Sequence, residues 1–237
     1  MSESFFCRFG VSEIASRIDH AVLKPWSSVS ELEKAIRELE ELNLRCLIIS
    51  PTHLRLAREK TNKCLGVVVG FPFGYSTIEA KIKELEDSIA LGAQEIDYVA
   101  NTQLLLAGRT EEYLNEIRAA ITICRDSGVK CKVIIEAPAL PRNLLVEIVE
   151  KIAMMDPHPD YIKTSTGYGP RPTYVEDVYL IDQTLRRIGK RDEIGIKAAG
   201  GIREGLQAAA MLLAGADVIG TSTPRQVIET YKELCRI

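Results

Sequence analysis

Short apolar segments alternate with longer amphipathic segments along the chain. The short segments are rich in β-branched and other apolar residues, as in strands of a parallel sheet whose outer face is covered by helices. The predicted strands are 17–23, 45–50, 65–71, 94–100, 131–137, 160–164, 194–198 and 216–221.

Amphipathic helical patterns occupy the intervals between these strands. In the clearest, 77–92, Ile78, Ile82 and Leu85 lie on one helical face, and Gly92 is placed to end the helix. The other predicted helices are 29–42, 52–60, 111–127, 141–154, 175–189, 204–214 and 224–236.

The order of these elements predicts the fold class. Eight strand–helix units in 237 residues indicate an α/β protein, a TIM (β/α)8 barrel forming a single domain over 1–237. The alternative is a doubly wound open sheet, but its dinucleotide fingerprint, G-x-G-x-x-G after the first strand, is missing.

Charge and hydropathy narrow the class of protein. A formal net charge of -3 gives no bulk attraction to nucleic acid or anionic membrane, and no apolar run approaches the length of a membrane span. The first residues also lack the apolar region of a signal peptide. We therefore expect a soluble cytoplasmic protein that has neither nucleic-acid nor membrane partners.

The cysteines are scattered without C-x-x-C spacing, and several lie in apolar strand-like segments. We expect them to be reduced and to behave as small apolar core residues. They are Cys7, Cys46, Cys64, Cys124, Cys131 and Cys235.

Polar side chains near the carboxyl ends of the predicted strands are the candidates for chemistry, because TIM barrels carry their active sites at those ends. They are Asp19, Asp97, Glu136, Lys163 and Lys197. The two lysines need a physical reason to be there, since burying an unpaired ammonium group is costly.

Lys163 and Lys197 lie on neighbouring predicted strands, and such strands are about 4.8 Å apart. If both side chains point inward, desolvation and mutual repulsion lower their pKa values. A partly neutral lysine is competent to form a Schiff base with a carbonyl group. The alternative is that one lysine forms a buried salt bridge with Asp97 or Glu136 and does no chemistry.

The acidic candidates allow more than one interpretation. Asp97 fits either a structural partner of the lysines or a proton relay. Asp19 and the adjacent His20 fit either a proton relay or an ordered hydrogen-bond pair. We expect Glu136 to orient a lysine and not to react itself.

Glycine-rich segments follow the last two predicted strands and suit a phosphate group, which barrels often bind there through backbone N–H groups. Gly200 and Gly201 permit close approach of the backbone. Gly220 leads into Thr221 and Ser222, which add hydroxyl donors.

Metal chemistry is not indicated by the histidines. His20, His53 and His158 are far apart in the sequence, and no two of them have ligand spacing on a helix. We expect no bound metal.

These candidates lie in segments that resemble the deoxyribose-phosphate aldolases, a family of class I aldolases with the TIM-barrel fold. The pair K-T-S-T-G and K-A-x-G-G-I-R, in this order and spacing, is specific, and V-G-F-P-x-G adds to it. The similar segments are 17–25, 67–74, 92–101, 132–137, 161–167, 196–203 and 215–222.

The resemblance implies reversible cleavage of 2-deoxy-D-ribose 5-phosphate into D-glyceraldehyde 3-phosphate and acetaldehyde. Lys163 would form the Schiff base, Lys197 would lower its pKa, and Asp97 would work with Lys197 in proton transfer. Asp19 matches a further active-site aspartate.

The resemblance also implies binding residues and partners. Thr166, Gly200, Gly201 and Ser222 would surround the substrate or its phosphate group. No metal or organic cofactor is required, because the iminium group accepts the electrons. The partners would be sugar-phosphate and aldehyde substrates, together with further copies of the chain in a dimer or tetramer.

Two other functions fit part of the pattern. The first is another lysine-dependent sugar-phosphate aldolase or a transaldolase-like barrel, and the second is a non-catalytic barrel that binds phosphorylated sugars. The chain also departs from the family pattern in its Thr221–Thr223 segment, where a double serine is common, and in lacking the C-terminal tyrosine of some members.

Overall fold

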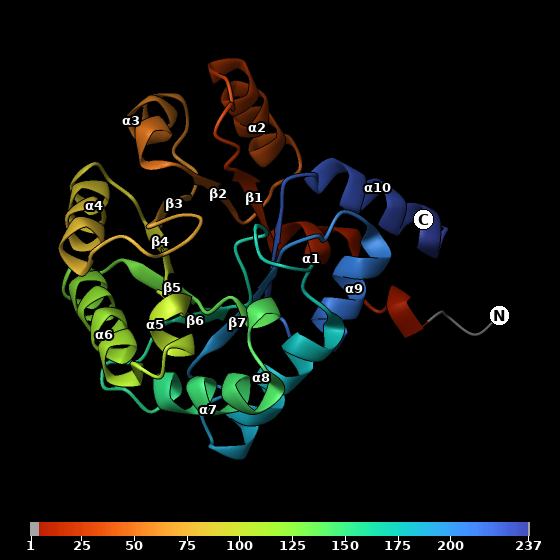
Figure 1. Cartoon of the computed structure of the whole chain (residues 1–237). Helices are drawn as coiled ribbons and strands as arrows, with labels where there is room; N and C mark the ends of the chain where they lie inside the picture. Colours follow the sequence, from red (N-terminus) through yellow and green to blue (C-terminus); the bar gives the residue numbers. More distant parts are fainter. Residues whose placement is uncertain (1–4, 237) are drawn as a thin grey trace.

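The apolar segments form eight parallel strands that close into a TIM barrel, with each strand paired to its neighbours in chain order (Figure 1). We analysed a computed structural model, which describes residues 5–236. The strands are β1 (Ile18–Val22), β2 (Cys46–Ile49), β3 (Leu65–Val69), β4 (Glu95–Val99), β5 (Lys130–Ile134), β6 (Tyr161–Lys163), β7 (Gly195–Ala199) and β8 (Val218–Thr221).

Helices surround this barrel on its outer face (Figure 1). Those predicted from the sequence are α2 (Val29–Glu41), α3 (Pro51–Lys60), α4 (Ile78–Ala90), α6 (Thr110–Asp126), α7 (Arg142–Ala153), α8 (Val175–Arg187), α9 (Gly205–Leu213) and α10 (Pro224–Cys235). Short helices that the sequence analysis missed are η1 (Phe5–Cys7), α1 (Val11–Ser16), α5 (Thr102–Leu106) and η2 (Ala137–Ala139). Such short helices carry too little periodicity to be recognised from sequence.

Local chemistry fixes the ends of the long helices. At the start of α2, the Ser28 hydroxyl accepts a hydrogen bond from the Glu31 amide, and the Glu31 carboxylate accepts one from the Ser28 amide. This capping box satisfies two amide groups that the helix itself leaves without partners. Gly92 follows α4 with a φ of 93°, in agreement with its predicted role.

The two faces of the strands have different surroundings. One face of each strand packs against the helices in a large apolar core that includes Leu47 and Ile49. Inside the barrel, the apolar cluster is small and centres on Cys46, Ile48 and Val68. Much of the remaining interior holds charged side chains, which form the candidate site.

The prediction that all six cysteines are reduced is wrong for four of them. Disulfide bonds join Cys7 to Cys235 and Cys46 to Cys64, whereas Cys124 and Cys131 are free and buried. Cys46 and Cys64 meet because β2 and β3 are neighbours in the sheet. Barrel closure brings α10 beside η1, and these first and last described helices lie on the same side of the molecule (Figure 1).

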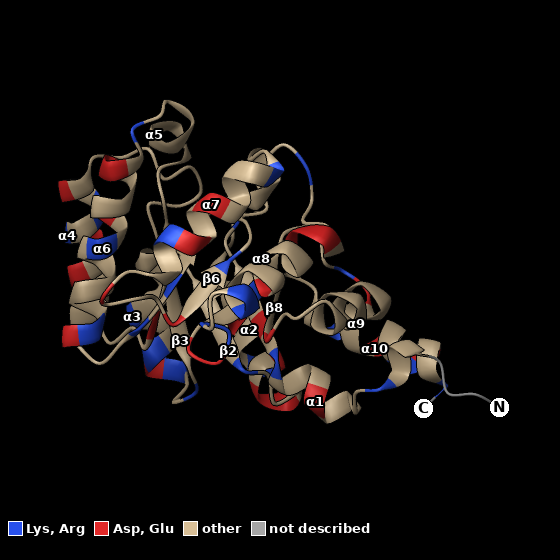
Figure 2. Ribbon diagram, turned by 90° about the horizontal axis from the view of Figure 1, so that it is seen from below, with Lys and Arg blue, Asp and Glu red and all other residues tan. Residues whose placement is uncertain are grey.

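Acidic and basic residues are mixed along the helices around the barrel (Figure 2). Among residues 5–236, no helix has the length and apolar character needed to cross a membrane.

Candidate active site

Lys163 and Lys197 lie directly beside each other on β6 and β7, where their Cα atoms are register partners. Both side chains point into the barrel and are buried. The Nζ atom of Lys163 lies 2.8 Å from Oδ2 of Asp97, and that of Lys197 lies 2.7 Å from the same oxygen. The predicted neighbourhood of the two lysines and Asp97 is therefore confirmed.

Asp97 also binds a third lysine, which the sequence analysis did not select. Lys132, on β5, donates a hydrogen bond of 2.9 Å to Oδ1 of Asp97. Burial alone would raise the pKa of Asp97, but Lys132, Lys163 and Lys197 together hold it well below its usual value. Asp97 is thus a permanent carboxylate shared by three ammonium groups.

Lys132, like Lys163, is a lysine within a predicted apolar strand, in the segment C-K-V-I-I. It lies before the carboxyl end of the strand, where active-site residues of a TIM barrel are expected. Burial disfavours its charge, but Asp97 and Glu95 outweigh burial and raise the pKa of Lys132 above its usual value.

A second set of ion pairs lies deeper in the barrel. Asp19, on β1, lies 2.6 Å from Lys197 Nζ through Oδ2 and accepts a 2.6 Å hydrogen bond from Arg45 Nε through Oδ1. Arg45 also donates two hydrogen bonds to Glu95, and Lys132 Nζ lies 2.6 Å from Glu95 Oε2. The sequence analysis missed Arg45 and Glu95, because neither lies near the carboxyl end of a strand.

Lys163 differs from Lys132 and Lys197 in having only one carboxylate partner, Asp97. Burial lowers its pKa, Asp97 raises it and Lys197 lowers it again, with a resulting pKa of about 8. A lysine of ordinary pKa is almost fully protonated at neutral pH, whereas Lys163 has an appreciable neutral fraction there.

Asp19 and His20 do not form the pair that the sequence suggested. Adjacent residues in a strand point to opposite faces, so Asp19 enters the barrel while His20 points toward α2. His20 Nδ1 lies 3.9 Å from Glu38 Oε2. Burial lowers the pKa of His20 to about 4, although Glu38 opposes the shift.

Glu136 holds a loop and makes no ion pair with a lysine among residues 5–236, contrary to the expectation. Its Oε2 atom accepts hydrogen bonds from the backbone N–H and the hydroxyl group of Thr166. Burial raises the pKa of Glu136, and its contacts with Thr166 lower it only in part. The hydroxyl group of Thr166 is therefore already engaged.

An open cavity of about 480 Å³ lies above the lysines, at the carboxyl ends of the strands. Lys163 and Lys197 reach its wall, whereas Asp97 and Asp19 lie behind them and do not line it. The residues predicted to bind substrate all line the cavity: Thr166, Gly200, Gly201, Gly220, Thr221 and Ser222.

Glycine is required at two positions of this cavity for different structural reasons. Gly201 has a φ of 84°, and a Cβ there would lie 2.7 Å from Cβ of Pro172. A Cβ at Gly220 would lie 3.2 Å from Cε of Lys197, so Gly220 makes room for the stem of that lysine. Only the first of these leaves backbone free to approach an anion.

Hydroxyl groups at the exit of β8 are also not equivalent. Thr221 is buried and donates its hydroxyl hydrogen to the carbonyl oxygen of Ile202, whereas Ser222 is exposed. Cationic side chains that line the same cavity are Lys24, Lys34 and Arg203. An anionic group at this end of the cavity would therefore meet Ser222, backbone N–H groups and these cationic side chains.

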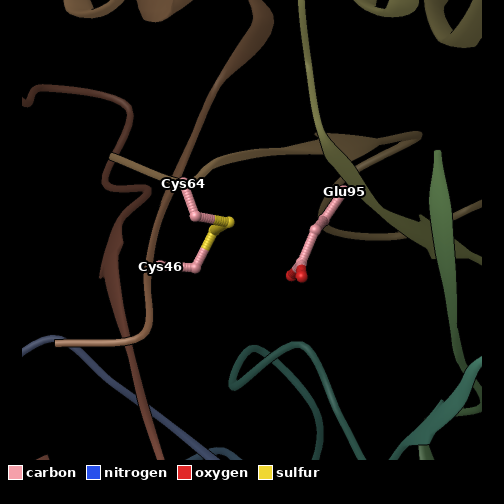
Figure 3. A group of neighbouring side chains, drawn as sticks. All are labelled: Cys46, Cys64 and Glu95. Carbon is pink, nitrogen blue, oxygen red and sulfur yellow. A yellow bond between two sulfur atoms is a disulfide. The ribbon is translucent and has the colours of Figure 1, made fainter. Parts of the chain in front are cut away.

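Cys46, Cys64 and Glu95 place their sulfur and oxygen atoms within 4.8 Å of one another in the barrel (Figure 3). The two sulfur atoms are bonded to each other, and the Glu95 carboxylate is already paired with Arg45 and Lys132. This group therefore acts as a disulfide beside an ion-paired carboxylate.

The arrangement suits attack of an amine on a carbonyl group. A buried lysine with a lowered pKa faces an open cavity, a carboxylate fixes its position, and a second lysine lies within reach for proton transfer.

Comparisons with known proteins identify the family that the chain resembles. The family model for the DeoC/LacD family aldolases matches residues 14–229. A deoxyribose-phosphate aldolase of Bacteroides thetaiotaomicron is 38% identical over 230 residues, which cover 94% of this chain and 92% of that protein. One of Methanothermobacter thermautotrophicus is 37% identical over 93% of this chain and 96% of its own length.

Solved structures include a similar barrel. A tetrameric deoxyribose phosphate aldolase from Aeropyrum pernix has a TM-score of 0.85 and 30% sequence identity. The match covers 95% of this chain and 93% of that one.

Proposed function

The chain belongs to the DeoC/LacD aldolase family, and from that premise we propose that it reversibly cleaves 2-deoxy-D-ribose 5-phosphate through a Schiff base on Lys163. The products are D-glyceraldehyde 3-phosphate and acetaldehyde. The observation that carries the proposal is Lys163 itself, a buried lysine with a pKa of about 8 at the wall of an open cavity.

The reaction begins when neutral Lys163 attacks C1 of the open-chain sugar. Loss of water gives an iminium ion. Removal of the proton from the C3 hydroxyl group lets the C2–C3 bond break, and its electron pair moves toward the iminium nitrogen. Glyceraldehyde 3-phosphate leaves, the remaining enamine takes a proton at C2, and water releases acetaldehyde from Lys163.

In this proposal Lys197 carries out the proton transfers, and Asp97 works with it by accepting a hydrogen bond from its Nζ atom. The Nζ atom of Lys197 is held between Asp97 and Asp19 and reaches the cavity wall beside Lys163. Asp97 keeps its negative charge throughout, so it stabilises each positively charged intermediate on Lys163. Asp19 positions Lys197 from behind.

The phosphate group would bind where β7 and β8 end. Gly200 and Gly201 would offer backbone N–H groups, and Ser222 would add a hydroxyl donor. Gly220, inside β8, would contribute by leaving room for the stem of Lys197. Thr166 and Thr221 would shape this region, because their hydroxyl groups already have protein partners. Lys24 and Arg203 provide charge close by.

The proposal includes a cytoplasmic protein that is a single domain, needs no metal or organic cofactor and assembles as a homo-oligomer. The iminium ion accepts the electrons of the breaking bond, which is the step for which a metal would otherwise be used. The tetrameric relative supports assembly.

Borohydride reduction in the presence of deoxyribose 5-phosphate or acetaldehyde tests the proposal. We expect a stable adduct on Lys163, located by peptide mapping, and activity that survives a metal chelator. An adduct on another lysine, or none, would contradict the assignment. Product analysis separates this reaction from that of another sugar-phosphate aldolase, and a non-catalytic barrel would release no acetaldehyde.

Replacing Gly201 with alanine tests the phosphate site. The new Cβ clashes with Pro172 at a backbone angle that L-residues rarely adopt, so the loop must move. We expect KM for deoxyribose 5-phosphate to rise by about tenfold or more, because charge-assisted hydrogen bonds to phosphate are lost. Steady-state kinetics with unphosphorylated deoxyribose should change much less.

Gly189→Ala is the matched control for this variant. Gly189 also has a positive φ, 71°, but a Cβ there would meet nothing within 4 Å. It shares the backbone strain and lacks the clash at the cavity, so its KM should match that of the unmodified protein. Equal losses with both sugars in Gly201→Ala would contradict a phosphate role.

A further inference from the structure

The charged side chains inside the barrel form a closed ring of ion pairs. Going around it, Arg45 binds Glu95, Glu95 binds Lys132 and Lys132 binds Asp97. Asp97 binds Lys197, Lys197 lies against Asp19, and Asp19 returns to Arg45. Cations and carboxylates alternate at every step, so the ring is neutral.

Lys163 is attached to this ring from outside, through Asp97 alone. Each cation of the ring has two carboxylate partners, whereas Lys163 shares an oxygen atom that Lys197 also contacts. Among the described residues, the cations joined in this way therefore outnumber the carboxylates by one. The surplus charge lies on the group with the fewest partners.

Arg45 is the member of the ring that enters from the opposite end of the barrel. It precedes β2, and its guanidinium group contacts Asp19 through Nε and Glu95 through both terminal nitrogens. It also lies over the ring of Tyr161. It does not line the cavity, so it has no access to substrate.

We propose that Arg45 is a positioning residue for Lys163: by satisfying Asp19 and Glu95, it completes a neutral ring and leaves Lys163 as the one surplus cation. This inference rests on the proposed role of Lys163. Without Arg45, the interior has equal numbers of carboxylates and ammonium groups, and protonated Lys163 becomes the favoured state.

Four titratable groups face Lys163 and influence its charge. They are Asp97 from β4, Lys132 from β5, Glu136 after β5 and Lys197 from β7. Asp97 favours the charged form of Lys163, and the two lysines oppose it. Glu136 accepts hydrogen bonds from Thr166 and, among the described residues, forms no ion pair with Lys163, so it stands outside the chain of ion pairs.

Two substitutions of opposite sign test the inference. Arg45→Met removes a positive charge, so the acid limb of the pH profile of kcat/KM should move up by about one pH unit, as expected when one buried charge is lost from a cluster. Glu95→Gln removes a negative charge with almost no change in shape. Its acid limb should move down by a similar amount.

Three further variants separate charge from structural damage. Arg45→Lys keeps the charge and should leave the acid limb near that of the unmodified protein. In the double variant Arg45→Met/Glu95→Gln, the acid limb should also lie near that of the unmodified protein, because one positive and one negative charge are removed together. Arg55→Met is the matched control, since Arg55 is exposed on α3 and outside the ring.

The outcomes distinguish this inference from the proposed function. Shifts of opposite sign with an adduct on Lys163 support both. An unmoved acid limb, or shifts of the same sign in Arg45→Met and Glu95→Gln, overturns the inference while the adduct on Lys163 still supports the function. If Lys163 forms no adduct, the function fails, and the pH dependence of Lys163 acetylation, followed by mass spectrometry, tests the ring alone.

Discussion

Replacing Lys197 with leucine is expected to raise the pKa of Lys163 above about 8 and to lower kcat/KM by roughly 10²–10⁴-fold at neutral pH. Two effects act together. The neighbouring positive charge disappears, and Asp97 Oδ2 is left to Lys163 alone. Both favour the protonated form of Lys163, which cannot attack a carbonyl group, and the proton donor beside the substrate is also lost.

The pH profile separates the raised pKa of Lys163 from the loss of proton transfer by Lys197. Because the pKa of Lys163 lies near 8, its neutral fraction rises with pH, so activity of the unmodified protein should increase through that pH. In Lys197→Leu the acid limb should move to higher pH, and raising the pH should restore only the part of the activity that depends on neutral Lys163. The remaining deficit measures the lost proton transfer.

Lys130→Leu is the matched control for that measurement. Lys130 begins β5, as an exposed residue of the same strand that carries Lys132. Its removal should leave both the pH profile and kcat/KM close to those of the unmodified protein. An unmoved acid limb in Lys197→Leu would show that the pairing of the two lysines does not set the state of Lys163.

The sequence predicts the lysine pair because the pattern is local. An apolar strand that ends in a lysine is unusual, and consecutive strands of a TIM barrel are neighbours, so Lys163 and Lys197 had to meet if both pointed inward. The same reasoning predicts that Asp97, two strands before Lys163, lies near the lysines if it also points inward. The structure adds that one carboxylate serves both, which the sequence allowed but did not require.

The rest of the charged interior depends on geometry that the sequence does not state. Arg45 lies outside the strand that follows it, and only the three-dimensional course of its side chain brings it to Glu95, 50 residues further along. Lys132 was visible as a lysine in an apolar segment. Its partners were not, because pairing depends on the stagger of the strands as well as on their order.

The same limit explains the error over the cysteines. Neither pair has a short spacing, since Cys46 and Cys64 are 18 residues apart and Cys7 and Cys235 are 228 apart. The first pair depends on the β2–β3 contact and the second on closure of the whole barrel. Composition and spacing indicate disulfides only when a short framework is present.

Removal of the Cys7–Cys235 disulfide is expected to lower the free energy of unfolding substantially. The bond closes a loop of 228 residues, almost the whole described chain. The chain-entropy model gives an upper bound of about 5 kcal/mol for a loop of this length, because the cross-link restricts the unfolded state. For a chain of this size, the corresponding fall in Tm is on the order of 10 °C.

Thermal and denaturant unfolding under oxidising conditions measures this effect in the variants Cys7→Ser and Cys235→Ser. If the bond is the cause, the double variant should be no less stable than either single variant, and a reductant should affect the double variant less than the unmodified protein. Tyr231 should keep the ends of the chain together in every variant, since its hydroxyl group binds both the N–H and the carbonyl group of Phe9. Activity at low temperature should therefore be unchanged, whereas additive losses in the double variant would assign the effect to packing of the two side chains.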